Sequence, residues 1–102
     1  MDEAGFREYL MATPWYKRSA ARARRLGRAY EGLDRTVDRV RDFLAYLAEH
    51  RGKVAEDADV ADMRAFLDWP GKPAKVAPGV YRGDISSYLR FRGWTSRRTI
   101  RK

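Results

Sequence analysis

Residues 33–47, LDRTVDRVRDFLAYL, decide the fold class of this chain. The apolar residues here recur at spacings of four and three, which places them on one face of an α-helix. They are Leu33, Val37, Val40, Leu44 and Leu47, flanked by Phe43 and Tyr46. Asp34 is the predicted N-cap and Gly52 the predicted stop of this helix. A stripe of this length must be covered by other elements, and the flanking sequence is expected to supply them.

The residues before this stretch predict two further helices. The first runs from about Glu3 to Met11, with Phe6 and Leu10 inward, and stops at Thr13-Pro14. The second begins either at Pro14 or after Ser19. Its inner side is formed by Ala20, Ala23, Leu26 or Gly27, and Tyr30. Because most of these residues are small, we expect this helix to pack closely against its neighbours.

Two more helices are predicted after Gly52. A short one follows Asp57 or Asp59, and another starts near Pro78 or Gly79 beyond the loop WPGKPAKVAPG, residues 69–79. Their inward residues are Val60, Met63, Phe66 and Leu67 in the first, and Tyr81, Ile85, Tyr88 and Leu89 in the second. No segment alternates as a strand would. We therefore predict an all-α, SAM-like compact bundle of four to five helices over residues 1–94, with a basic tail, 95–102, that is disordered on its own.

Composition excludes several classes of function. The chain has 102 residues, enough for one domain, with 44% hydrophobic residues to form its core. It contains no cysteine and a single histidine, which excludes disulfides, thiolate chemistry and Cys-based metal sites. Apolar runs are too short to span a membrane, and the acidic start lacks the pattern of a signal peptide. A cytoplasmic location is expected.

The formal net charge of +8 is distributed unevenly. Residues 14–30, called the basic segment below, contain six basic residues and no acidic one. Residues 82–102 contain seven basic residues and one acidic residue, whereas the rest of the chain is slightly acidic. Like charges at helical spacing repel each other by roughly 0.2 to 0.5 kcal/mol per pair. A polyanionic partner removes that repulsion, and a merely solvated surface is the alternative.

The basic segment and the C-terminal segment therefore supply the candidate nucleic-acid contacts. These residues are Lys17, Arg18, Arg22, Arg24, Arg25, Arg28, Arg90, Arg92, Arg97, Arg98, Arg101 and Lys102. Two tryptophans, Trp15 and Trp94, are candidates for stacking on bases, with a position at the edge of the core as the alternative. The chain has no asparagine or glutamine for adenine readout, so we expect modest sequence specificity.

Catalytic and metal-binding motifs are absent from the sequence. No phosphate-binding glycine loop, nucleophile elbow or HExxH zinc motif occurs. His50 lies at the predicted end of a helix, where its ring nitrogens are expected to bond the terminal carbonyls, as a cap, or solvent. The carboxylates Glu56, Asp57, Asp59 and Asp62 could be considered as metal ligands, but no glycine-turned loop spaces them as calcium requires. We expect no metal, no cofactor and no enzymatic activity.

Four short runs together suggest a family. They are Phe6-Arg7-Glu8-Tyr9-Leu10, Ser19-Ala20-Ala21-Arg22, Phe43-Leu44-Ala45-Tyr46-Leu47, and the stretch from Tyr81 to Leu89. Over residues 6–92 this pattern resembles the SAM-like core-binding domain of tyrosine recombinases, the phage integrases. The resemblance implies a helical bundle that clamps one side of duplex DNA, with Lys17, Arg18, Arg22 and Arg25 in the matching position. The catalytic residues of those enzymes belong to a separate domain, so it implies DNA binding rather than strand transfer.

The sequence thus predicts a non-catalytic module that grips the phosphate backbone of duplex DNA. A protein-interaction module of the adaptor or antitoxin kind, with its basic face against an acidic partner, is one alternative. An RNA-binding module is another, favoured if Trp15, Trp94 and the neighbouring tyrosines are exposed. The cognate sequence and the oligomeric state are not predicted.

Overall fold

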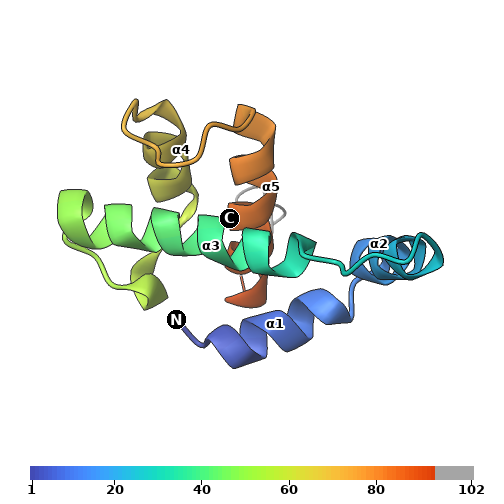
Figure 1. Ribbon diagram of the computed structural model, residues 1–102. Helices are drawn as coiled ribbons and strands as arrows, with labels where there is room; N and C mark the ends of the chain where they lie inside the picture. The colour runs from blue at the N-terminus through green and yellow to red at the C-terminus, as the bar shows by residue number, and fades with distance from the viewer. Residues whose placement is uncertain (94–102) are drawn as a thin grey trace, which may run out of the picture.

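A computed structural model of the protein describes residues 1–93 as a helical bundle (Figure 1). Its α-helices are α1 (Glu3–Met11), α2 (Pro14–Arg25), α3 (Gly32–Tyr46), α4 (Val60–Asp68) and α5 (Pro78–Phe91). A π-helical turn, η1 (Leu47–Arg51), extends α3, and a short 3-10 turn, η2 (Ala55–Asp57), precedes α4. These residues contain no strand, so the predicted all-α fold is confirmed. Residues 69–77 of the predicted loop lie between α4 and α5, whereas its last two residues, Pro78 and Gly79, begin α5.

Helix α3 is the centre of the bundle and packs against α1, α4 and α5. The buried hydrophobic residues come from all four helices and from η1. They are Phe6, Leu10, Val37, Val40, Phe43, Tyr46, Leu47, Met63, Phe66, Tyr81, Ile85, Tyr88 and Leu89. The inward residues predicted for α5 are all in this core, as are Met63 and Phe66 of α4. Val60 and Leu67 are only partly buried.

The buried face of α3 is rotated from the predicted stripe. Val37, Val40 and Leu47 are fully buried as expected, but Leu33 and Leu44 are only partly buried. Phe43 takes the central position that the spacing assigned to Leu44, and it is fully buried against Phe66, with 5.6 Å between the ring centroids. The large aromatic rings fill the space between α3 and α4, which leaves Leu44 at the edge.

The predicted N-cap is observed at the start of α4 but not at the start of α3. Asp59 caps α4 and forms a capping box with Asp62. Asp34 does not cap α3, because the helix begins two residues earlier, at Gly32, and Glu31 occupies the N-cap position without a side-chain bond. Asp34 instead accepts a hydrogen bond from Arg7 of α1 at 2.7 Å. This ion pair joins α1 to α3. At the other end, the extension of α3 ends before Gly52, as predicted.

One carboxylate is fully buried. Asp62 accepts hydrogen bonds from Arg51, from Lys53 at 2.9 Å and from the backbone N–H of Asp59 at 3.1 Å. Burial raises the pKa of Asp62, but the bonds from Lys53 and Arg51 outweigh it and hold this pKa below its ordinary value. Both Asp62 oxygens are therefore occupied by neighbouring cations, which explains this carboxylate without a metal ion.

The bundle measures 43 × 33 × 23 Å along its principal axes. Its longest dimension reflects α2, which stands away from the other helices at one side (Figure 1). Within residues 1–93, no helix combines the length and apolar character needed to cross a bilayer.

Candidate nucleic-acid interface

Thr13 fixes the direction in which α2 leaves the bundle. Its hydroxyl donates to the carbonyl of Leu10 at the end of α1 and accepts from the backbone N–H of Tyr16 at 3.4 Å. Pro14 follows as the first residue of α2. Of the two predicted starts, Pro14 is therefore correct and Ser19 lies inside the helix. Thr13 thus follows the end of α1 and caps α2, so the two helices are joined by a tight turn.

Gly27 ends α2 and turns the chain back toward α3. Its φ of +70° lies in the left-handed region that favours glycine. The backbone N–H of Arg28 then bonds the carbonyl of Ala23 at 2.9 Å, which closes a Schellman motif. The helix stops at Arg25, and Leu26 and Tyr30 belong to the linker, residues 26–31, rather than to the predicted inner side of the helix.

The predicted close packing of α2 is wrong. None of its residues is buried, and its main contacts are with α1. Ala20 and Ala23 are only partly covered, and Leu26 is 53% exposed. The reason is volume, because a helix face made of alanines offers little apolar area to bury. Helix α2 is therefore an arm on the bundle rather than a part of its core.

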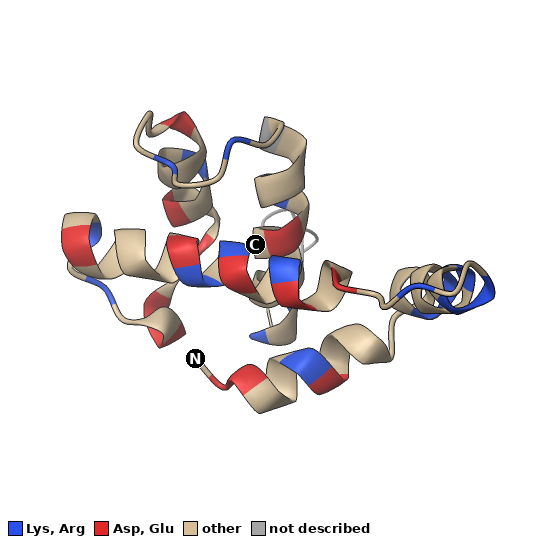
Figure 2. Cartoon of the chain, viewed as in Figure 1, with Lys and Arg blue, Asp and Glu red and all other residues tan. Residues whose placement is uncertain are grey.

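All six cations of the basic segment are exposed. Five of them belong to α2 and Arg28 to the linker that follows, and Figure 2 shows this part of the chain without acidic residues up to Glu31. Four of them line one shallow depression of about 690 Å³, with Ser19 and Ala21 between them: Lys17, Arg18, Arg22 and Arg25. Arg24 and Arg28 are exposed beside it. The structure thus brings together the residues predicted on α2. The small side chains between the arginines leave room for an anion to approach the guanidinium groups.

Six cations of the bundle differ from those of α2 and its linker because they have carboxylate partners. The paired cations are Arg7, Arg35, Arg39, Arg41, Arg51 and Lys53. The hydrogen bonds that Arg7 donates to Asp34 and Glu3 raise the pKa of Arg7, and the bond that Arg41 donates to Glu3 raises the pKa of Arg41. In the described part of the chain, no cation of the basic segment lies within ion-pair distance of a carboxylate. The other described cations of the bundle have no carboxylate partner either, but they are spread over α4, α5 and the loop between them: Arg64, Lys72, Lys75, Arg82, Arg90 and Arg92. Within residues 1–93, the densest group of unpaired cations is therefore on α2 and its linker.

The C-terminal contribution is only partly described. Arg90 lines a depression of about 450 Å³ together with Trp15 and Tyr30, so it lies near the start of α2. Arg92, at the end of α5, is exposed. The predicted contacts Trp94, Arg97, Arg98, Arg101 and Lys102 lie outside the described residues.

Trp15 is less available for stacking on bases than the sequence predicted. Its side chain is partly buried and packs against the hydrophobic core. Its ring lies edge-on to Tyr16, with 6.3 Å between the centroids. Trp15 therefore belongs to the edge of the core, the alternative considered for it, while one side still lines the depression with Arg90.

The predicted capping role of His50 is not seen. Its ring stacks on Tyr46 with 5.3 Å between the centroids and lies 4.9 Å from the ring of Trp69. Among residues 1–93 it forms no hydrogen bond to a helix carbonyl. His50 lies in the π-helical turn η1, where it is exposed and its imidazole contacts these two aromatic rings.

Tyr30 is a candidate contact residue that the sequence analysis did not single out. It lines both the depression with Trp15 and a second cleft beside Arg28. A signal was present in the sequence, because Gly27 and Gly32 bracket the residue and mark it as part of a linker. The helical spacing alone assigned Tyr30 to the core side of a longer helix.

Comparison of the chain with models of protein families, with curated protein sequences and with solved structures finds no match.

Proposed function

We propose that this chain is a non-catalytic DNA-binding module that contacts the phosphate backbone of duplex DNA through α2 and the basic C-terminal segment. The observation that supports this proposal is the distribution of paired and unpaired cations over the molecule. Six cations of the bundle are paired with carboxylates and the others are spread over it, whereas the six of the basic segment are exposed, lie within residues 17–28 and have no such partner within the described residues. A neighbouring polyanion supplies the missing counter-charge.

The shape of the arm favours a backbone as its partner. Arg18, Arg22 and Arg25 follow one line along α2, which is about 18 Å long for its 12 residues. Lys17 and Arg24 form a second line beside it. Duplex DNA carries one negative charge per about 1.7 Å of its axis, so such rows meet several phosphates at once. Contacts of this kind position a protein on DNA without reading the DNA sequence.

The proposal retains the resemblance to the core-binding domain of tyrosine recombinases. Phe6 and Leu10 of the first run, and Tyr46 and Leu47 of the third, are core residues, which is compatible with a bundle of that kind. A cytoplasmic location and the absence of a cofactor belong to the same proposal.

Two matched triple variants test the assignment. Arg18→Ala/Arg22→Ala/Arg25→Ala removes three charges from α2, and Arg64→Ala/Lys75→Ala/Arg82→Ala removes three exposed charges from α4, its loop and α5, on another side of the molecule (Figure 2). Net charge is the same in both variants. In fluorescence anisotropy with labelled duplex DNA, the α2 variant should bind about 100-fold more weakly than the native chain. The second variant should lose much less affinity.

Other outcomes of this experiment would assign a different role to α2. Equal losses in the two variants would mean that binding follows net charge and has no site on α2. Tighter binding to structured RNA than to duplex DNA would favour an RNA-binding module. No binding of any nucleic acid at low salt would overturn the proposal and favour an acidic protein as the partner.

A further inference from the structure

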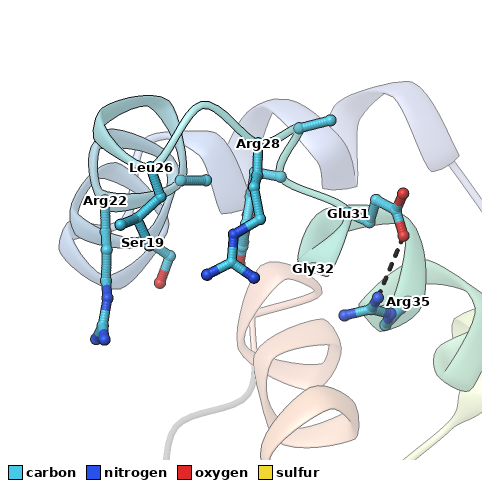
Figure 3. A pocket seen from close by; sticks show the side chains of 10 residues that line it. Ser19, Arg22, Leu26, Arg28, Glu31, Gly32 and Arg35 are labelled. Atoms are coloured by element: carbon cyan, nitrogen blue, oxygen red, sulfur yellow. Dashed lines mark hydrogen bonds and ion pairs between the residues drawn. The ribbon is translucent and has the colours of Figure 1, made fainter.

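A cleft of about 550 Å³ lies between α2 and the linker that returns to α3 (Figure 3). Its volume is within the range of small-molecule sites. The lining residues are Ser19, Arg22, Ala23, Leu26, Arg28, Ala29, Tyr30, Glu31, Gly32 and Arg35. This cleft is on a different side of α2 from the depression between Lys17 and Arg25, because only Ser19 and Arg22 line both.

The cleft combines an apolar wall with free cations. Ala23, Leu26 and Tyr30 provide the apolar part, and Leu26 is 53% exposed although it is a large hydrophobic residue. Arg22 and Arg28 extend in the same direction in Figure 3 and have no carboxylate partner in the described chain. Arg35, at the far side, is paired with Glu31 at 3.2 Å. An anionic group thus has two arginines available beside an apolar surface.

The ring of Tyr30 is held in place on two sides. It packs edge-on against Tyr16, with 5.5 Å between the ring centroids. On another side it covers Gly32 so closely that a Cβ atom on Gly32 would lie 2.3 to 2.7 Å from its ring and hydroxyl. The glycine therefore makes room for the ring. A fixed aromatic side chain loses little conformational entropy when a planar ligand contacts it.

We propose that this cleft accepts one unpaired nucleotide of the DNA that α2 binds. Its base lies against Tyr30 and Leu26, and its phosphate is held by Arg22 and Arg28. An aromatic or apolar surface beside arginines is the usual way to hold an unstacked base and its backbone. A paired base cannot enter, because its faces are covered within the duplex. The inference rests on the proposed function and adds a preference for DNA with an unpaired nucleotide.

Three labelled duplexes of one sequence test this preference by anisotropy. The first is fully paired, the second contains a single unpaired thymidine, and the third contains an abasic unpaired residue at the same point. The native chain should bind the second about tenfold more tightly than the other two, which is within the range that stacking of one base contributes. Comparison with the abasic duplex separates contact with the base from bending of the backbone.

Two variants assign the preference to the cleft. Ala23→Leu fills it with a side chain that a helix tolerates well, and Tyr30→Ala removes the aromatic contact. Each should abolish the tenfold preference. Ala23→Leu should leave the affinity for the fully paired duplex within about twofold, whereas Tyr30→Ala also removes the contact with Tyr16, so its preference is judged against its own duplex affinity. Ala61→Leu, on the exposed side of α4, is the matched control and should keep the preference.

The outcomes separate this inference from the proposed function. If the native chain binds all three duplexes equally, the nucleotide site is wrong and backbone binding stands. If it binds none of them, both are wrong. If Ala23→Leu and Tyr30→Ala both keep the preference, the unpaired nucleotide is bound elsewhere and the assignment to this cleft is overturned.

Discussion

The ring of Tyr30 packs edge-on against the ring of Tyr16, with 5.5 Å between their centroids. This contact joins the linker that follows α2 to the first turn of α2 itself. Because no residue of α2 is fully buried, the tyrosine pair, the Thr13 cap and the packing of Trp15 against the core are the contacts that set the position of the arm. The cationic surface therefore depends on an aromatic contact outside the core.

Replacement of Tyr16 by alanine should loosen the arm without unfolding the bundle. An aromatic pair of this kind contributes about 1 kcal/mol. Trypsin should therefore cleave after Arg24 or Arg25 about fivefold faster in Tyr16→Ala, because local opening exposes these bonds more often. Tyr16→Phe keeps the ring and should be cleaved at the native rate. Unchanged cleavage of Tyr16→Ala would show that the pair does not hold the arm.

Two neighbouring core substitutions should differ in cost because α3 is rotated. Phe43 is fully buried, whereas Leu44 is only partly buried. Phe43→Ala should lower the free energy of unfolding by about 3 to 5 kcal/mol, and Leu44→Ala by about 1 to 2 kcal/mol. Urea denaturation followed by circular dichroism measures both. Equal costs, or a larger cost at Leu44, would contradict the rotation described for α3.

Asp62 should make the stability of the bundle sensitive to acid. Its pKa is held below its ordinary value by Lys53 and Arg51 in the folded state, so the carboxylate stabilises the fold above its unfolded pKa, near 3.8. That contribution is lost as the pH falls through the lowered folded pKa. Asp62→Asn should cost about 1 to 3 kcal/mol at pH 7, since two partly buried cations lose their acceptor. The variant should also show a smaller decrease in stability between pH 5 and acid than the native chain, and an equal decrease would contradict this role.

Deletion of residues 95–102 should weaken DNA binding and leave the fold intact. The deletion removes Arg97, Arg98, Arg101 and Lys102, whereas the buried hydrophobic residues found within residues 1–93 lie between Phe6 and Leu89. Affinity for duplex DNA should fall about tenfold at moderate salt because four potential phosphate contacts are lost. The thermal midpoint should be unchanged. A lower midpoint would show that this segment stabilises the bundle.

The sequence predicts the bundle well because its apolar spacing is regular. Tyr81, Ile85, Tyr88 and Leu89 recur at helical intervals, and all four are buried. The same spacing could not decide between Phe43 and Leu44, since both lie within one helical face and the choice depends on how α4 packs. The prediction that Asp34 caps α3 is wrong because the helix begins at Gly32. Asp34 instead pairs with Arg7, and this contact depends on the position of α1, which the sequence does not specify.

The candidate interface is less predictable from sequence than the core. The sequence shows six cations between Lys17 and Arg28 with no acidic residue among them, and the structure places these residues together on α2 and its linker. Whether α2 packs or protrudes depends on the amount of apolar area that its alanines can bury, which spacing does not report. The contact between Tyr16 and Tyr30 depends on the turn at Gly27, and it joins residues on two sides of that turn.

The salt dependence of duplex binding tests the central proposal most directly. Each phosphate neutralised by a cation contributes about 0.9 to the slope of the logarithm of the binding constant against the logarithm of salt concentration. The native chain should give a slope of several units, and Arg18→Ala/Arg22→Ala/Arg25→Ala should lower it by about 2.7. The control Arg64→Ala/Lys75→Ala/Arg82→Ala should keep the native slope. An equal slope in all three proteins would contradict a phosphate-binding role for α2.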